Sequence, residues 1–179
     1  MGTEKSAAPR VAVFGHSKPD PATYALAERV GRWLAARGYT VVNGGYGGTM
    51  EATAKGARSQ GGKVIGVTCE IWPTAANEYV TRQVPTENLF ERLTTLMELA
   101  DAGLAVLPGG TGTLLELVAA WELLNKRLMN ERPLVCVGEF WRPVVERVVQ
   151  SQPKAAGAIR FAADVEYLGA VFGSVEDSE

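Results

Sequence analysis

The chain has 179 residues, of which 46% are hydrophobic, enough for one well-cored domain and too few for two domains of ordinary size. Its 18 basic and 20 acidic residues give a net charge of −2, which argues against nucleic acid or a membrane surface as a partner. Two cysteines and one histidine provide no zinc cluster or disulfide scaffold, and no apolar run could span a membrane, so we predict a cytoplasmic protein with no metal or other cofactor.

Short β-rich runs alternate with helical patterns along the chain. In order, we predict a strand at 11–15, a helix at 21–37, a strand at 40–43, a helix at 49–59, a strand at 63–67, an irregular stretch at 68–85 and a helix at 86–100. A strand at 103–107, a helix up to 122, a strand at 133–137, a helix at 140–149, a strand at 159–161 and a helix capped by Asp164 follow.

This alternation predicts an α/β fold, a Rossmann-like doubly wound parallel sheet with helices on both faces. Residues 11–173 are expected to form one nucleotide-binding domain. Residues 1–10 are expected to be a disordered leader, and residues 174–179 an acidic tail.

Loops that carry glycine or serine follow the first, second and fourth predicted strands. They are 15–17 (G-H-S), 44–48 (G-G-Y-G-G) and 108–112 (P-G-G-T-G). In the common strand order 3-2-1-4-5 these strands are neighbours, so their carboxyl ends line one crevice, where open α/β sheets bind ligands. A dehydrogenase is disfavoured, because its glycine fingerprint would follow the first strand.

The loop after the fourth strand is predicted to bind phosphate. Gly109, Gly110 and Gly112 carry no Cβ, so the backbone N–H groups can approach an anion where the next helix begins. Thr111 lies within the same loop, and Thr113 adds a hydroxyl. Glycines that only turn the chain are about as common at such a corner, and this alternative stays open.

Arg92 falls on the edge of the apolar stripe of the helix at 86–100, where a guanidinium needs an anionic partner. The alternative is that Arg92 reaches solvent or pairs with Glu87, Glu91 or Glu98.

Glu116 also has two interpretations. Thr113 and Glu116 match a capping box, in which the glutamate bonds the backbone at the helix start. Alternatively, Glu116 is a carboxylate in the first turn of the helix, held ionised by the dipole beside the phosphate-binding loop.

These motifs together resemble the Lonely Guy (LOG) family of cytokinin-nucleotide phosphoribohydrolases. P-G-G-T-G-T-L-L-E at 108–116 is similar to the family signature P-G-G-x-G-T-x-x-E, and 11–17, 37–52 and 61–67 resemble the family's first strand, second glycine segment and third strand. The resemblance implies that Arg92, nine residues before Asp101, is the catalytic arginine and that Glu116 is the catalytic glutamate.

The resemblance also implies an activity: hydrolysis of the N-glycosidic bond of a nucleoside 5′-monophosphate, such as a cytokinin riboside monophosphate or an AMP-like nucleotide. The expected binding residues are Ser17, Gly45, Gly47, Gly48, Gly109, Gly110, Thr111, Gly112 and Thr113. A homodimer or larger homo-oligomer is implied as well, and Trp121 and Trp141, if exposed rather than in the core, would fit that assembly.

Some residues depart from the family pattern. Leu93 and Leu115 stand where the family usually has lysine and glutamate. M-E-A at 50–52 resembles the related molybdenum-cofactor carriers, so a non-enzymatic nucleotide or cofactor carrier is the open alternative. A pyridoxal-phosphate lysine decarboxylase would need a lysine in the pocket, and Lys18 is the only remote candidate.

Overall fold

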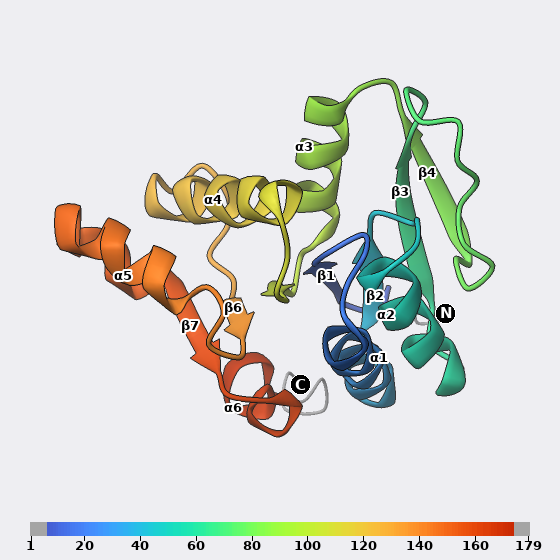
Figure 1. Cartoon of the computed structure of the whole chain (residues 1–179), viewed down its shortest axis with the longest axis horizontal. Coiled ribbons are helices and arrows are strands. Elements are labelled where there is room, and N and C mark those ends of the chain that lie inside the picture. Colours follow the sequence, from blue (N-terminus) through green and yellow to red (C-terminus); the bar gives the residue numbers. More distant parts are fainter. Residues whose placement is uncertain (1–6, 174–179) are drawn as a thin grey trace, which may run out of the picture.

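A seven-stranded sheet, parallel throughout, forms the centre of the computed structural model, which describes residues 7–173 (Figure 1). Its order is β4-β3-β2-β1-β5-β6-β7. The strands are β1 (Arg10–Phe14), β2 (Thr40–Asn43), β3 (Val64–Cys69), β4 (Arg82–Thr86), β5 (Gly103–Val106), β6 (Leu134–Val137) and β7 (Ile159–Ala162). The Rossmann-like α/β fold is confirmed. Residues 1–6 of the predicted leader and the predicted tail lie outside the described residues.

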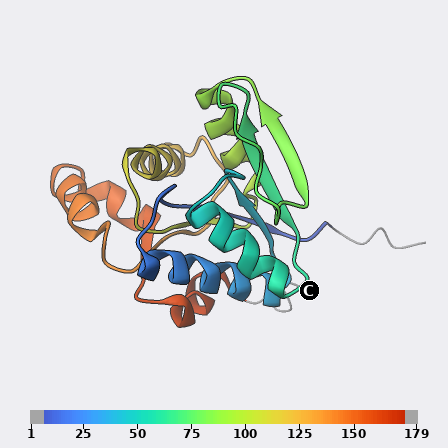
Figure 2. The same ribbon diagram turned by 45° about the vertical axis from the view of Figure 1, so that its right-hand side comes forward.

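Helices cover both faces of the sheet (Figures 1 and 2). One face carries α1 (Pro21–Ala36), α2 (Thr49–Ser59) and α6 (Gly169–Phe172), and the other carries α3 (Leu89–Leu99), α4 (Thr111–Asn125) and α5 (Arg142–Ser151). Side chains of β1 alternate between the two cores, with Val11 and Val13 in the first and Ala12 and Phe14 in the second. Because both faces are buried, the central strands are mostly apolar, as in the V-A-V-F run of β1.

The prediction of an irregular stretch at 68–85 is wrong at its end, because β4 begins there at Arg82 and forms the edge of the sheet. It pairs with β3 from Ile65↔Arg82 to Cys69↔Thr86. Its sequence, R-Q-V-P-T, is mostly polar and contains Pro85, which a sheet tolerates at its edge but not at its centre. Because Thr86 belongs to β4, the next helix begins later than predicted, after the Asn88 side chain, which accepts hydrogen bonds from the N–H groups of Phe90 and Glu91 at 3.0 Å.

The end of the chain also differs in detail from the prediction. The Asp164 side chain accepts a hydrogen bond from the Val165 N–H at 2.7 Å, but the element it caps is a 3₁₀ turn, η2 (Val165–Tyr167), and α6 follows it. Another 3₁₀ turn, η1 (Pro153–Ala158), precedes β7.

The two tryptophans considered for an assembly surface are core residues. Trp121 and Trp141 are 5% and 4% exposed. Each indole N–H donates to a backbone carbonyl, that of Trp121 to Ala155 at 3.0 Å and that of Trp141 to Leu107 at 2.8 Å. The interpretation of these side chains as surface aromatics is therefore wrong, and any argument for assembly has to rest on other residues.

Candidate functional site

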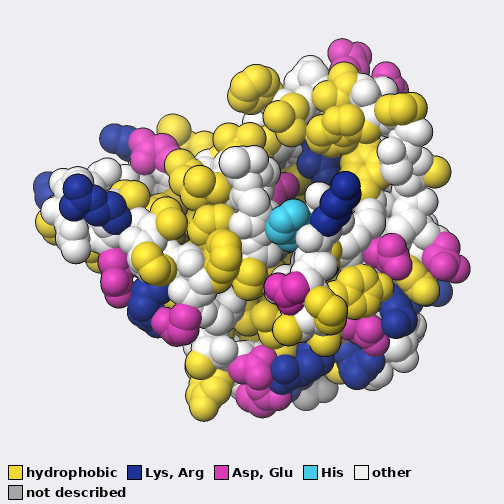
Figure 3. Space-filling view, in the orientation of Figure 1, with side chains coloured by type: hydrophobic (Ala, Val, Ile, Leu, Met, Phe, Trp, Pro, Cys, Tyr) yellow, Lys and Arg dark blue, Asp and Glu magenta, His cyan; other side chains and the backbone are white. Residues whose placement is uncertain are grey.

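A cavity of about 450 Å³ opens at the carboxyl end of the sheet. Residues that follow β1, β2, β3 and β5 line it, together with side chains from α3 and α4. The sheet order places β1 between β2 and β5, and the chain leaves these strands toward opposite faces, which is the switch point where open α/β sheets bind ligands. Figure 3 shows the molecule hollowed on this face.

Several of the predicted site residues meet in this cavity. They are Ser17, Arg92, Gly110, Thr111, Gly112, Thr113 and Glu116. Residues 15–17 and 110–113 come from loops that are far apart in the sequence. The structure brings them together because β1 and β5 are paired neighbours, Phe14 opposite Val106.

Other predicted residues, Gly45, Gly47, Gly48 and Gly109, are not among the lining residues. The Gly45 carbonyl accepts hydrogen bonds from the backbone and side chain of Asn77, at 2.8 and 3.0 Å. Gly48 has a φ of +70°, and a Cβ there would lie 2.4 Å from the Ser17 carbonyl oxygen. Gly48 thus lets the first two loops pack against each other. Ligand contact by these glycines stays a prediction.

Helix α4 starts at the mouth of the cavity. Gly110 is its N-cap, and no side chain of the described residues caps it. Thr113 and Glu116 therefore lie inside the helix, so the predicted capping box is wrong, as is the placement of Glu116 in the first turn. The N–H groups of the first turn have no partner within a helix and are available to an anion.

Arg92 is buried and only 7% exposed. Its Nε donates to the Val67 carbonyl at 2.8 Å. The predicted alternatives for Arg92 are wrong, because its side chain does not reach solvent and, within residues 7–173, no carboxylate forms an ion pair with it. The Glu91 carboxylate instead accepts from the Glu87 N–H. Since a buried guanidinium without a counter-charge is costly, its position favours an anionic ligand.

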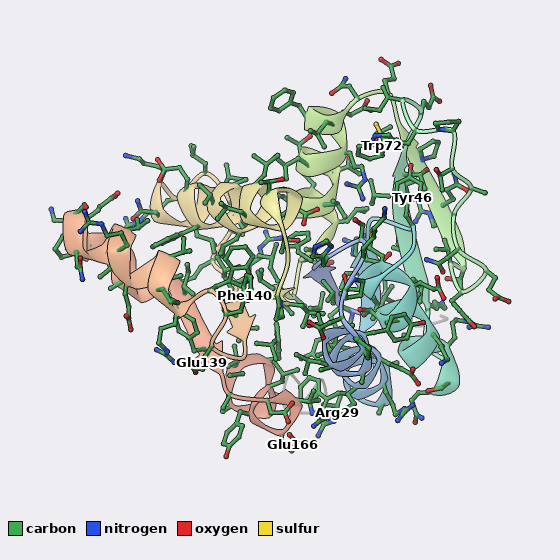
Figure 4. All side chains as sticks on the ribbon, in the orientation of Figure 1. Arg29, Tyr46, Trp72, Glu139, Phe140 and Glu166 are labelled. Carbon is green, nitrogen blue, oxygen red and sulfur yellow. The ribbon has the colours of Figure 1, made fainter. Side chains whose placement is uncertain are left out.

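Two aromatic rings flank this guanidinium. Its central carbon lies 5.3 Å from the ring centroid of Trp72 and 5.7 Å from that of Tyr46, and the two rings meet edge to face at 5.7 Å (Figure 4). Gly44 completes the enclosure, because a Cβ there would lie 1.7 Å from an Arg92 terminal nitrogen.

The sequence did not single out some of the lining residues: His16, Tyr46, Trp72 and Thr74. The sequence around Tyr46 does mark it as unusual, because this aromatic residue stands between two pairs of glycines. The sequence around Trp72 and Thr74 carries no such mark, because they belong to the loop between β3 and β4. Asn77 of that loop donates to the carbonyls of Gly45 and Tyr46, which holds the loop against the cavity.

Glu116 is half-buried and lines the same cavity as Arg92. Burial raises the pKa of its carboxyl from 4.5 to about 7, and the positive charge of Arg92 opposes this rise. A carboxyl whose pKa lies near neutral pH suits a group that exchanges a proton.

Other chemistries find little support here. Within residues 7–173, no group of three or more His, Cys, Asp or Glu is placed to hold a metal ion. The lining residues of this cavity include no lysine, so a pyridoxal-phosphate enzyme would lack its Schiff-base partner there.

None of the helices described in residues 7–173 has the length and apolarity that a membrane span requires.

The fold is Rossmann-like, with a cavity at the carboxyl end of the sheet, and sequence comparison identifies the family. The sequence profile of the SLOG cluster4 family matches residues 8–166, and the chain belongs to that family. An uncharacterized protein of Archaeoglobus fulgidus is 34% identical over 128 residues, which are 72% of this chain and 83% of that protein.

Two further comparisons concern proteins with named functions. The cytokinin riboside 5′-monophosphate phosphoribohydrolase of Mycobacterium tuberculosis is 37% identical over 115 residues, which are 62% of this chain and 61% of that enzyme. The molybdenum cofactor carrier protein of Chlamydomonas reinhardtii has a similar structure, with a TM-score of 0.73 and coverage of 91% and 94%. At 22% sequence identity, this structural similarity shows a shared fold and no more.

The raised pKa of Glu116 predicts how stability depends on pH. A carboxyl whose pKa is higher in the folded state stabilises the fold below its unfolded pKa, and this stability is lost as pH rises through about 7. Glu116→Gln does not titrate. We therefore expect its melting temperature to exceed that of the wild type by a few degrees at about pH 8, with the difference shrinking toward about pH 5. Melting curves across this range test the assignment, and a difference that does not change with pH would contradict it.

Proposed function

We propose that this protein hydrolyses the N-glycosidic bond of a nucleoside 5′-monophosphate, releasing a free base and ribose 5-phosphate. One observation carries the proposal: a carboxyl with a pKa of about 7 and a buried, unpaired guanidinium line one cavity beside the uncapped start of a helix. The sequence similarity to the mycobacterial phosphoribohydrolase supports it.

The cavity offers a distinct environment for each part of such a nucleotide. The first-turn N–H groups of α4, at Thr111, Gly112 and Thr113, suit the 5′-phosphate. Glu116 lies further along the same helix and lines the same cavity, which suits a role at the ribose. Tyr46 and Trp72 offer aromatic surface to the base, and Trp72 is 38% exposed.

The proposed step breaks the bond between C1′ of the ribose and the base nitrogen. The bonding electrons leave with the base, positive charge develops on C1′ and the ring oxygen, and the oxygen of a water molecule bonds to C1′. The Glu116 carboxylate stabilises the developing charge and accepts a proton from that water. The departing base takes up a proton from solvent, and Glu116 returns its proton to solvent, so that one water is consumed in all. Arg92 favours the ionised form of Glu116 and offsets the negative charge of the nucleotide.

A non-enzymatic carrier is the second candidate. Met50, which begins the M-E-A segment that resembles the molybdenum-cofactor carriers, lines the cavity. A carrier would bind a phosphorylated ligand at the same helix start and release no base.

The charge of Glu116 separates these two functions. Glu116→Gln keeps the shape of the side chain and removes the carboxylate, so we expect base release to fall by a factor on the order of 10² to 10³, with nucleotide affinity little changed. The measurement is free base produced from a panel of nucleoside monophosphates, alongside calorimetric binding. Unimpaired release by the variant would remove Glu116 from the mechanism. A wild type that binds a monophosphate without releasing base would establish the carrier.

The start of α4 provides a test of phosphate binding. A Cβ on Gly110 would meet no atom closer than 3.9 Å, so Gly110→Val should fold while its side chain obstructs the first-turn amides. We expect nucleotide binding to be lost in calorimetric titrations. Gly157→Val is the matched control, since Gly157 lies in η1 and a Cβ added there would have no atom within 4 Å, and it should bind like the wild type. Normal binding by Gly110→Val would show that the phosphate lies elsewhere.

Exposed apolar side chains support assembly into a homo-oligomer. Phe90, Leu115, Val118 and Leu128 are exposed on α3, on α4 and just after α4, and Figure 3 shows apolar side chains gathered over α4. Such a patch is typical of a surface that another protein covers. We expect sedimentation to give at least a dimer at micromolar concentration and Val118→Lys to shift the mass toward the monomer. A wild-type mass equal to the monomer would refute the assembly.

A further inference from the structure

His16 lines the cavity, yet the proposed mechanism gives it no role. It stands in the loop after β1, and two sets of hydrogen bonds hold it in place. Its carbonyl accepts from the N–H and the hydroxyl of Thr49, at 2.9 and 3.0 Å. Its ring Nδ1 accepts from the Lys18 N–H at 2.9 Å. Both the backbone and the ring of His16 are therefore fixed, although the side chain is exposed.

The bond to Lys18 also decides where the ring carries its proton. A nitrogen that accepts a hydrogen bond has no proton of its own, so the neutral imidazole is protonated on Nε2. Nε2 is thus a donor, and it cannot switch to acceptor while the Lys18 N–H is bound at Nδ1.

Nε2 is directed toward the start of α4. It lies 3.9 Å from the place that a Cβ on Gly110 would occupy, and Gly110 is the uncapped N-cap of that helix. A second donor group, from a different loop, thus faces the first-turn amides. The buried guanidinium of Arg92 lies in the same cavity with no ion-pair partner among residues 7–173, which independently favours an anionic ligand there.

We propose that His16 recognises the 5′-phosphate of the ligand, with its Nε2–H donating to a phosphate oxygen opposite the amides of α4. This inference rests on the proposed nucleoside 5′-monophosphate as ligand, but not on its hydrolysis. The phosphate is then bound from two sides, by the helix start and by the imidazole. His16 makes the site specific for a phosphorylated ligand over the corresponding nucleoside.

Two substitutions at His16 separate the contributions of the two ring nitrogens. Asn in place of His16 keeps a polar acceptor near the position of Nδ1, so it can still bind the Lys18 N–H, but has no group at the position of Nε2. Gln extends its amide N–H to about the position of Nε2 and keeps the donor. Melting temperatures of both variants show whether the loop is intact.

The test is calorimetric titration of the wild type, His16→Asn and His16→Gln with AMP, ribose 5-phosphate and adenosine. We expect His16→Asn to lower the affinity for AMP and for ribose 5-phosphate roughly tenfold or more, because a hydrogen bond to a charged oxygen is lost. The affinity for adenosine should not change. His16→Gln should retain most of the affinity. Equal weakening of AMP and adenosine, or no change in any ligand, would overturn the role of His16, as would a wild type that binds neither phosphorylated ligand.

Base release measured on the same proteins keeps the two proposals apart. If the wild type releases no base but His16→Asn loses phosphate affinity, the hydrolase is refuted and the role of His16 stands. If the wild type releases base and His16→Asn binds AMP like the wild type, the role of His16 is refuted alone.

Discussion

The burial of Arg92 is the constraint that shapes this end of the molecule. Its guanidinium donates to the Val67 carbonyl and to the Met50 sulfur and lies against two aromatic rings, with Gly44 leaving the space that a terminal nitrogen needs. The end of β3, the loop after β2 and helix α3 thus all take positions that accommodate one side chain. A cation placed here lowers stability unless something offsets its charge, and such an arrangement is typical of a binding site rather than of a core.

Glu116 is the counterpart of Arg92 but not its ion-pair partner. If the two formed a close salt bridge, the carboxylate would be held ionised and its pKa would be low. Burial instead dominates and raises the pKa to about 7. Two opposite charges that share a cavity without contact leave room between them, and a ligand that enters this space interacts with both. The protein therefore gives up some stability to keep two ionisable groups in the cavity.

The sequence predicted the sheet and the centre of the site because both depend on local patterns. Alternating apolar strands and helices indicate a parallel sheet with helices on both faces, and the glycine loop and Arg92 are recognisable by their position in the pattern. The polar edge strand β4 was missed because its pairing comes from β3, not from its own composition. The capping box failed for a similar reason: the pattern at Thr113 and Glu116 was present, but α4 already begins after Gly110. Trp72 joins the site through the loop that Asn77 holds in place and through its contact with Tyr46, neither of which its local sequence indicates.

The connection between β3 and β4 joins two parallel strands without a helix, and it carries Trp72 and Thr74 into the cavity. The residues proposed for chemistry, Arg92 and Glu116, belong instead to helices packed on the sheet. Parts of a protein that serve different tasks can change independently when they are built on different elements. A change in the sequence of this one loop can therefore alter the lining of the cavity, while Arg92 and Glu116 keep the positions that α3 and α4 give them.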